Sequence, residues 1–107
     1  MYIDPGELNK RIQIQYQDPD TEAWSDVITL YARVNKAGGG QTFEAGADQH
    51  PYLLDFDIRY SSTAAKLVYA PHLYRVLYAG HAFKIVDTDD YMEGHQYLRI
   101  RGRMYEP

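Results

Sequence analysis

The sequence contains no cysteine, no long apolar run and no excess of basic residues. The absence of cysteine excludes disulfides and thiolate zinc sites. No apolar stretch approaches the roughly 18 residues of a membrane span, and no apolar segment follows a basic start. We therefore expect a soluble protein of a cytosol-like compartment, without membrane contact. A formal net charge of −4 disfavours a general nucleic-acid binder, which normally has a basic surface.

Phenylalanine and tryptophan are also scarce, with three and one residues against eleven tyrosines. Tyrosine suits subunit interfaces, because its ring is apolar and its hydroxyl is polar. It also has a high β-propensity, so a β-rich chain accounts for the same excess. The composition alone leaves both explanations open.

The length of 107 residues, with 45% hydrophobic and 24% charged residues, predicts one globular domain over 1–107. Apolar and polar residues alternate in short segments, which is the pattern of half-buried strands. We therefore predict an all-β fold, a small antiparallel β-barrel of about six strands. The expected strands cover about 11–17, 27–36, 54–60, 74–78, 83–86 and 96–104.

Three connections have local signals of their own. Asp4-Pro5-Gly6-Glu7 predicts a short N-terminal helical turn with a capping box. In Ala79-Gly80-His81-Ala82, glycine at the first central position predicts a type II′ turn between the fourth and fifth strands. Segment 61–72 is ambiguous, since Ser62 would cap a short helix that ends before Pro71.

The segment NKAGGGQTFEAGADQH, residues 35–50, interrupts the strand pattern. Its glycines give the backbone wide freedom, and Phe43 is its one bulky apolar side chain. Ordering each of these residues costs about 1–2 kcal/mol of backbone entropy, with little burial to offset it. The sequence therefore predicts one long flexible loop at about 35–53, which is either functional or simply disordered.

No pattern indicates a catalytic centre, a metal site or a cofactor. Acidic residues and His95 crowd segment 87–95, but Met92 stands where a calcium loop requires glycine. The chain has no G-x-S-x-G elbow, no H-E-x-x-H pair and no phosphate-binding loop. We expect no enzyme activity.

One basic feature is concentrated on the last expected strand, where Arg99, Arg101 and Arg103 share the outward face. These guanidinium groups would suit docking to acidic groups of a partner. The alternative is a solvated strand face whose charges prevent edge-to-edge aggregation.

Four segments in this order resemble the head–tail joining, or head-closure (stopper), family of tailed bacteriophages and prophages. They are DPGELNKRIQIQ at 4–15, LYARVNKAGGGQTFEAG at 30–46, DFDIRY at 55–60 and YRVLYAGHAFKIVDTDD at 74–90. The likeness covers essentially the whole chain, although segment 61–72 is longer than the family pattern.

The resemblance implies a structural connector protein of the virion neck, assembled in the bacterial host cytoplasm. It implies a homo-oligomeric ring, dodecameric in the family, below the portal and its adaptor. Such a ring retains packaged double-stranded DNA through transient contact, binds a tail-completion protein and provides the platform for tail attachment. The alternatives are a tail-completion protein of the same neck and a small nucleic-acid-binding β-barrel.

By the same resemblance, the loop after the second strand would reach the axis of the ring and gate its lumen. Identical loops meet at high local concentration in a closed ring and can order on assembly. The expected lumen residues are Gly38, Gly39, Gly40, Gln41, Thr42, Phe43, Glu44, Gly46 and Asp48.

Overall fold

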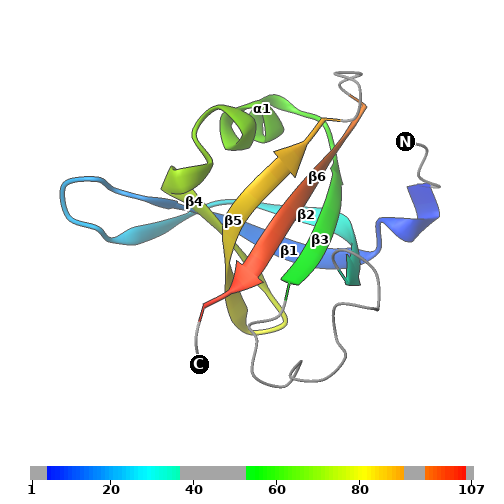
Figure 1. The fold of residues 1–107 in the computed structure, drawn as a ribbon, viewed down its shortest axis with the longest axis horizontal. Coiled ribbons are helices and arrows are strands. Elements are labelled where there is room, and N and C mark those ends of the chain that lie inside the picture. The colour runs from blue at the N-terminus through cyan, green and yellow to red at the C-terminus, as the bar shows by residue number, and fades with distance from the viewer. Residues whose placement is uncertain (1–4, 37–52, 91–95, 106–107) are drawn as a thin grey trace.

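The computed structural model describes residues 5–36, 53–90 and 96–105. Its six strands are all antiparallel and close into a barrel in the order β1-β2-β3-β6-β5-β4, with β4 pairing back onto β1 (Figure 1). The prediction of a small six-stranded β-barrel is thus confirmed. The strands are β1 (Lys10–Gln17), β2 (Trp24–Lys36), β3 (Leu53–Arg59), β4 (Tyr74–Tyr78), β5 (His81–Asp89) and β6 (Tyr97–Met104).

Two strands are longer than the alternation predicts. β2 starts at Trp24 instead of Val27 because its first residues pair with the end of β1, and the resulting hairpin projects beyond the barrel (Figure 1). It ends at Lys36, as the alternation predicts, so Asn35 and Lys36, which the predicted loop also included, belong to the strand. β5 continues to Asp89 through its pairing with β6. At the other end of the predicted loop, Leu53 is the first residue of β3, and residues 37–52 lie outside the described part of the chain.

Three short helical elements complete the described part of the fold. η1 (Pro5–Glu7) is the predicted N-terminal turn, in 3-10 form. The ambiguous segment contains α1 (Ser62–Tyr69) and η4 (Pro71–Leu73). Ser61, not Ser62, is the N-cap of α1, since its extended backbone lets its Oγ accept a hydrogen bond from the Ala64 amide at 3.3 Å. In the described ranges, no helix is long and apolar enough to cross a bilayer.

The core lies inside the barrel and under α1. Alternate residues of every strand point inward, as the period of two predicts. On β6 the inward residues include Leu98, Ile100 and Met104, which alternate with the arginines that the sequence predicts to face outward. Ala64 and Leu67 of α1 are fully buried against this core. The buried apolar set is Ile12, Ile14, Ala32, Phe56, Ile58, Ala64, Leu67, Val76, Phe83, Ile85, Leu98 and Ile100.

Gly102 makes room for the aromatic cluster at the centre of this core. Phe56 packs edge-on against Phe83 and Tyr78, with ring centroids 5.3 and 5.7 Å apart. A Cβ on Gly102 would stand 3.0 Å from the Phe83 Cβ and 3.1 Å from the Phe56 Cε2. The strand interior accepts a glycine here because the two rings occupy the space of its side chain.

The β4–β5 hairpin is where the sequence-based prediction of turn type is wrong. Tyr78 pairs with His81, so the two loop residues are Ala79 and Gly80, one position earlier than predicted. Both have positive φ, at 53° and 83°. Two positive φ values define a type I′ turn and not a type II′ turn, and they put a β-carbon in the left-handed region at Ala79.

Replacing Ala79 with asparagine should raise the free energy of unfolding by about 1 kcal/mol, because asparagine tolerates the left-handed conformation that alanine resists. The matched change, Gly80→Ala, should lower it by about 1 kcal/mol, since it adds a β-carbon at φ 83°. Urea unfolding midpoints of the two variants should therefore move in opposite directions. Midpoints moving in the same direction would contradict the type I′ turn.

Candidate functional site

A band of alternating charges crosses the outer face of β2, β3 and β6. Asp55 and Asp57 point outward from β3, between arginines of the two neighbouring strands. In the registers, Asp57 faces Arg33 of β2 and Arg99 of β6, and Asp55 faces Arg101 of β6. We call these five residues the arginine–aspartate network.

Asp57 is the centre of the network. Although it lies on the outside of the barrel, it is completely buried, because two guanidinium groups cover it. Arg33 donates from Nε and Nη2 to Oδ2 at 3.0 and 2.8 Å. Arg99 donates from Nε to Oδ1 at 2.8 Å and from Nη2 to Oδ2 at 3.2 Å. Charge-assisted bonds of this kind are the strong class, and here they join three strands.

The network continues in two directions from Asp57. Along β6, Arg101 donates to both oxygens of Asp55, at 3.0 Å from Nε and 3.4 Å from Nη2. Toward the N-terminus, Arg33 Nη1 bonds to Glu7 Oε1 at 2.9 Å, which ties η1 to the barrel wall. One ionic network therefore connects four elements that are distant in the sequence.

These contacts stabilise the protonated form of all three arginines, because each arginine has a raised pKa. The hydrogen bond to Asp57 raises the pKa of Arg99, and the hydrogen bond to Asp55 raises the pKa of Arg101. Desolvation pulls the pKa of Arg33 down, but its hydrogen bonds to Asp57 and Glu7 outweigh that effect, and the net shift is upward. All three guanidinium groups stay cationic across the biological pH range.

The three arginines predicted as a docking surface differ in their surroundings. Arg99 and Arg101 keep side-chain exposures of 36% and 40%, but both are bound to aspartates of this chain. Arg103 is exposed, and no ion pair involves it in the described ranges. β6 pairs with β3 on one side and β5 on the other, so it is not an edge strand. The alternative role of preventing edge-to-edge aggregation is therefore wrong.

β5 extends the charge pattern by one more strand. Asp87 lies opposite Arg101 and Asp89 lies opposite Arg99 in the register. Together with Thr88 these residues line a polar cavity of about 110 Å³. Among the described residues, no group of three or more His, Cys, Asp or Glu side chains could hold a metal ion.

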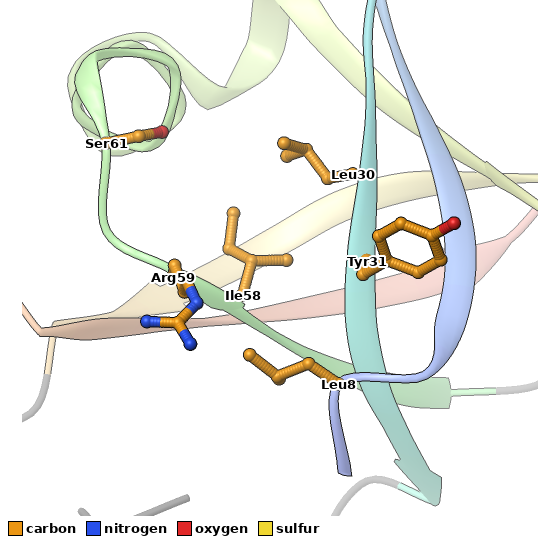
Figure 2. A pocket seen from close by; sticks show the side chains of 6 residues that line it. All are labelled: Leu8, Leu30, Tyr31, Ile58, Arg59 and Ser61. Atoms are coloured by element: carbon orange, nitrogen blue, oxygen red, sulfur yellow. The ribbon is translucent and has the colours of Figure 1, made fainter. Parts of the chain in front are cut away.

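A second, mainly apolar cavity of about 300 Å³ lies between β2 and β3 (Figure 2). Its lining comes from β2, β3, the segment before β1 and the N-cap of α1, and consists of Leu8, Leu30, Tyr31, Ile58, Arg59 and Ser61. Sequence reasoning missed this cavity, because its walls are distant in the chain. We call it the apolar pocket.

The expected lumen residues, from Gly38 to Asp48, lie outside the described residues, so the gating role of this loop stays a prediction. Sequence reasoning also missed the network. The D-x-D of β3 and the R-x-R of β6 were both visible as alternating charges, but their pairing depended on two strands separated by α1, β4 and β5.

Replacing Asp57 with asparagine should lower the free energy of unfolding by about 3 kcal/mol, because Arg33 and Arg99 would lose their shared counter-charge at nearly unchanged volume. Asp89→Asn is the matched control: this exposed carboxylate makes no ion pair within 4 Å in the described part, and its loss should cost under about 0.5 kcal/mol. Denaturant unfolding measures both. Equal costs for the two variants would contradict the central position of Asp57.

Comparisons with known proteins agree with this architecture. One solved structure, the solution structure of protein SF1141 from Shigella flexneri 2a, aligns with a TM-score of 0.58 over 95% of this chain and 96% of that chain; at 23% identity it supports the fold alone. The search of curated proteins found no significant match. The family model described as phage head completion protein matches residues 3–103. Because that match spans nearly the whole barrel, the chain belongs to the phage head completion protein family, a family of structural proteins of the virion head and neck.

Proposed function

We propose that this chain is a non-enzymatic head-closure subunit. Identical copies form a ring below the portal and its adaptor, retain the packaged DNA and present a platform to the tail-completion protein. The family match over residues 3–103 carries the proposal. The dodecameric state follows from the resemblance to stopper proteins and is part of the proposal.

The barrel supports a gate by the way it holds the long insertion. Lys36 and Leu54 are paired at the neighbouring ends of β2 and β3, so the two strand ends that flank residues 37–52 lie side by side at one point of the barrel wall. Rotational symmetry would present this point of every subunit at the same radius and height. Glu44 and Asp48 would limit adhesion to DNA, because like charges repel at short range.

The docking surface is proposed at Arg103, together with the solvent-exposed parts of the Arg99 and Arg101 side chains. The network leaves these two side chains partly accessible to solvent but holds their guanidinium groups in place. A surface of the adaptor or the tail-completion protein with a carboxylate opposite Arg103 and acceptors opposite the two paired guanidinium groups would fit, since little side-chain entropy is lost on binding.

Deleting residues 38–46 tests the gate. The barrel should fold normally, since Ala37 and residues 47–52 remain to join the adjacent strand ends. Particles assembled with this variant should lose DNA or fail to bind tails, as measured by packaged DNA per particle and by electron microscopy of the neck. Particles that keep their DNA and their tails would contradict the gating role, and a neck map without a ring of this chain would contradict the proposed function.

A charge reversal at Arg103 tests the docking surface. Arg103→Glu should leave the free energy of unfolding in urea within about 0.5 kcal/mol of wild type, because the side chain is exposed, and should reduce tail joining by about tenfold. Lys10→Glu, at another exposed strand position, is the matched control and should join tails normally. Equal tail joining by the Arg103 variant and the wild type would remove Arg103 from the docking surface.

The alternative of a nucleic-acid-binding barrel makes a different prediction. Because Asp55 and Asp57 already neutralise two arginines of the basic strand, we expect affinity for a DNA duplex weaker than about 100 μM at about 150 mM salt. Fluorescence anisotropy over a salt series measures this. Micromolar binding at that salt concentration would favour the alternative.

A further inference from the structure

β2 has an open edge over most of its length. On one side, Trp24 to Ala32 pair with β1. On the other side, β2 pairs with β3 only from Arg33 to Lys36. Within the described residues, the second edge of β2 between Trp24 and Ala32 therefore faces no strand. Backbone N–H and C=O groups on such an edge form a template for another strand.

The edge is open because β3 separates from β2 after Asp57, although it stays paired with β6 as far as Arg59. If the register of β2 and β3 continued beyond Arg33 and Asp57, Tyr31 would lie opposite Arg59. Instead, the chain turns away after Arg59 toward the N-cap of α1, and the two strands separate. The apolar pocket fills this separation, with Leu30 and Ile58 pointing into it (Figure 2). Pocket and open edge are thus parts of one surface.

The side chains along this edge are unusually apolar for a surface strand. The five residues Val27 to Tyr31 carry no charge, and Val27, Ile28 and Tyr31 are exposed by 41%, 38% and 55%. Soluble proteins normally blunt a strand edge with charges, proline or a covering segment. Strand-adding peptides bind an arrangement of this kind, an edge with an uncharged stretch beside an apolar cavity, by backbone bonds along the edge and by side chains in pockets.

The rim of this surface is positively charged. Arg59 is exposed, and no ion pair involves it in the part of the chain that the structure describes. Arg11 contacts the phenol of Tyr31, with its Nη2 3.3 Å from the hydroxyl and its guanidinium 5.8 Å from the ring centroid. An incoming strand would gain from a carboxylate at this rim.

We propose that the β2 edge from Trp24 to Ala32 binds an extended segment of another protein by strand addition. A bulky apolar side chain of that segment enters the apolar pocket, and a neighbouring carboxylate pairs with Arg59. A second copy of β2 fits less well, because the one carboxylate within this edge, Asp26, already accepts a hydrogen bond from Gln15 Nε2 at 2.8 Å. That the segment belongs to another neck protein rests on the proposed function, but the chemistry of the surface does not.

The test is a selection from a library of random decapeptides against the immobilised chain, followed by NMR titration of the ¹⁵N-labelled protein with the enriched peptides. Enriched sequences should combine a bulky apolar residue with an acid one or two positions away. Amide shifts should concentrate in β2 between Trp24 and Ala32 and around Leu8 and Ile58. Shifts concentrated elsewhere, or no enrichment above the immobilisation support, would overturn the proposal.

Two variants and a control locate the contact. Arg59→Glu should weaken the enriched peptides by about three- to tenfold, and Leu8→Trp, which fills the pocket, should weaken them at least as much. Lys84→Glu makes the same charge change on β5, away from this surface, and should leave the affinity unchanged. An NMR spectrum with native dispersion confirms that each variant folds.

Two further results separate the outcomes. Concentration-dependent shifts of the β2 amides without peptide would show that a second copy occupies the edge, and would overturn the choice of another protein. A normal ring in the particle neck together with failed peptide binding would overturn this inference but leave the proposed function intact. Specific peptide binding without any ring in the neck would support this inference and overturn the proposed function.

Discussion

The rest of this barrel depends on the two ion pairs that the buried carboxylate of Asp57 forms with Arg33 and Arg99. β2 and β3 pair over only four residues, so closure at this seam needs support beyond the backbone ladder. Asp57 supplies it by binding Arg33 of β2 and Arg99 of β6 simultaneously. An uncompensated charge at this position would be costly, which disfavours any register that separates the three side chains.

The Arg33–Asp57 pair also lies at the boundary between the part of the barrel wall where β2 and β3 are paired and the part where they are separated. Asp57 and Arg33 form the last pair of the β2–β3 seam before the strands separate. On one side of this pair the seam leads to the paired ends that flank residues 37–52. On the other side lie the apolar pocket and the open edge of β2. Two surfaces with different proposed partners are thus held at fixed positions by one ionic cluster.

The network also changes which partners the arginines of β6 are expected to bind. Three arginines on one face suggest a polyanion site when β6 is considered alone. With β3 alongside, Arg99 and Arg101 become part of a lattice of alternating charges that extends to Asp87 and Asp89 on β5. A lattice of this kind can discriminate between protein surfaces by charge pattern, whereas a free basic stripe would also attract DNA.

Local patterns in the sequence were sufficient for the number of strands, their approximate bounds and the alternation of inward and outward residues, because a period of two needs only neighbouring residues to be visible. Family membership was also recognisable, since it rests on the order of short motifs along nearly the whole chain. The tertiary structure decided the rest: the type I′ turn at Ala79, the capping role of Ser61, the pairing of Asp57 with two arginines, and the separation of β2 from β3. These features depend on which strands become neighbours and where they part. That choice is made by contacts between residues as distant as Asp57 and Arg99, which no local pattern encodes.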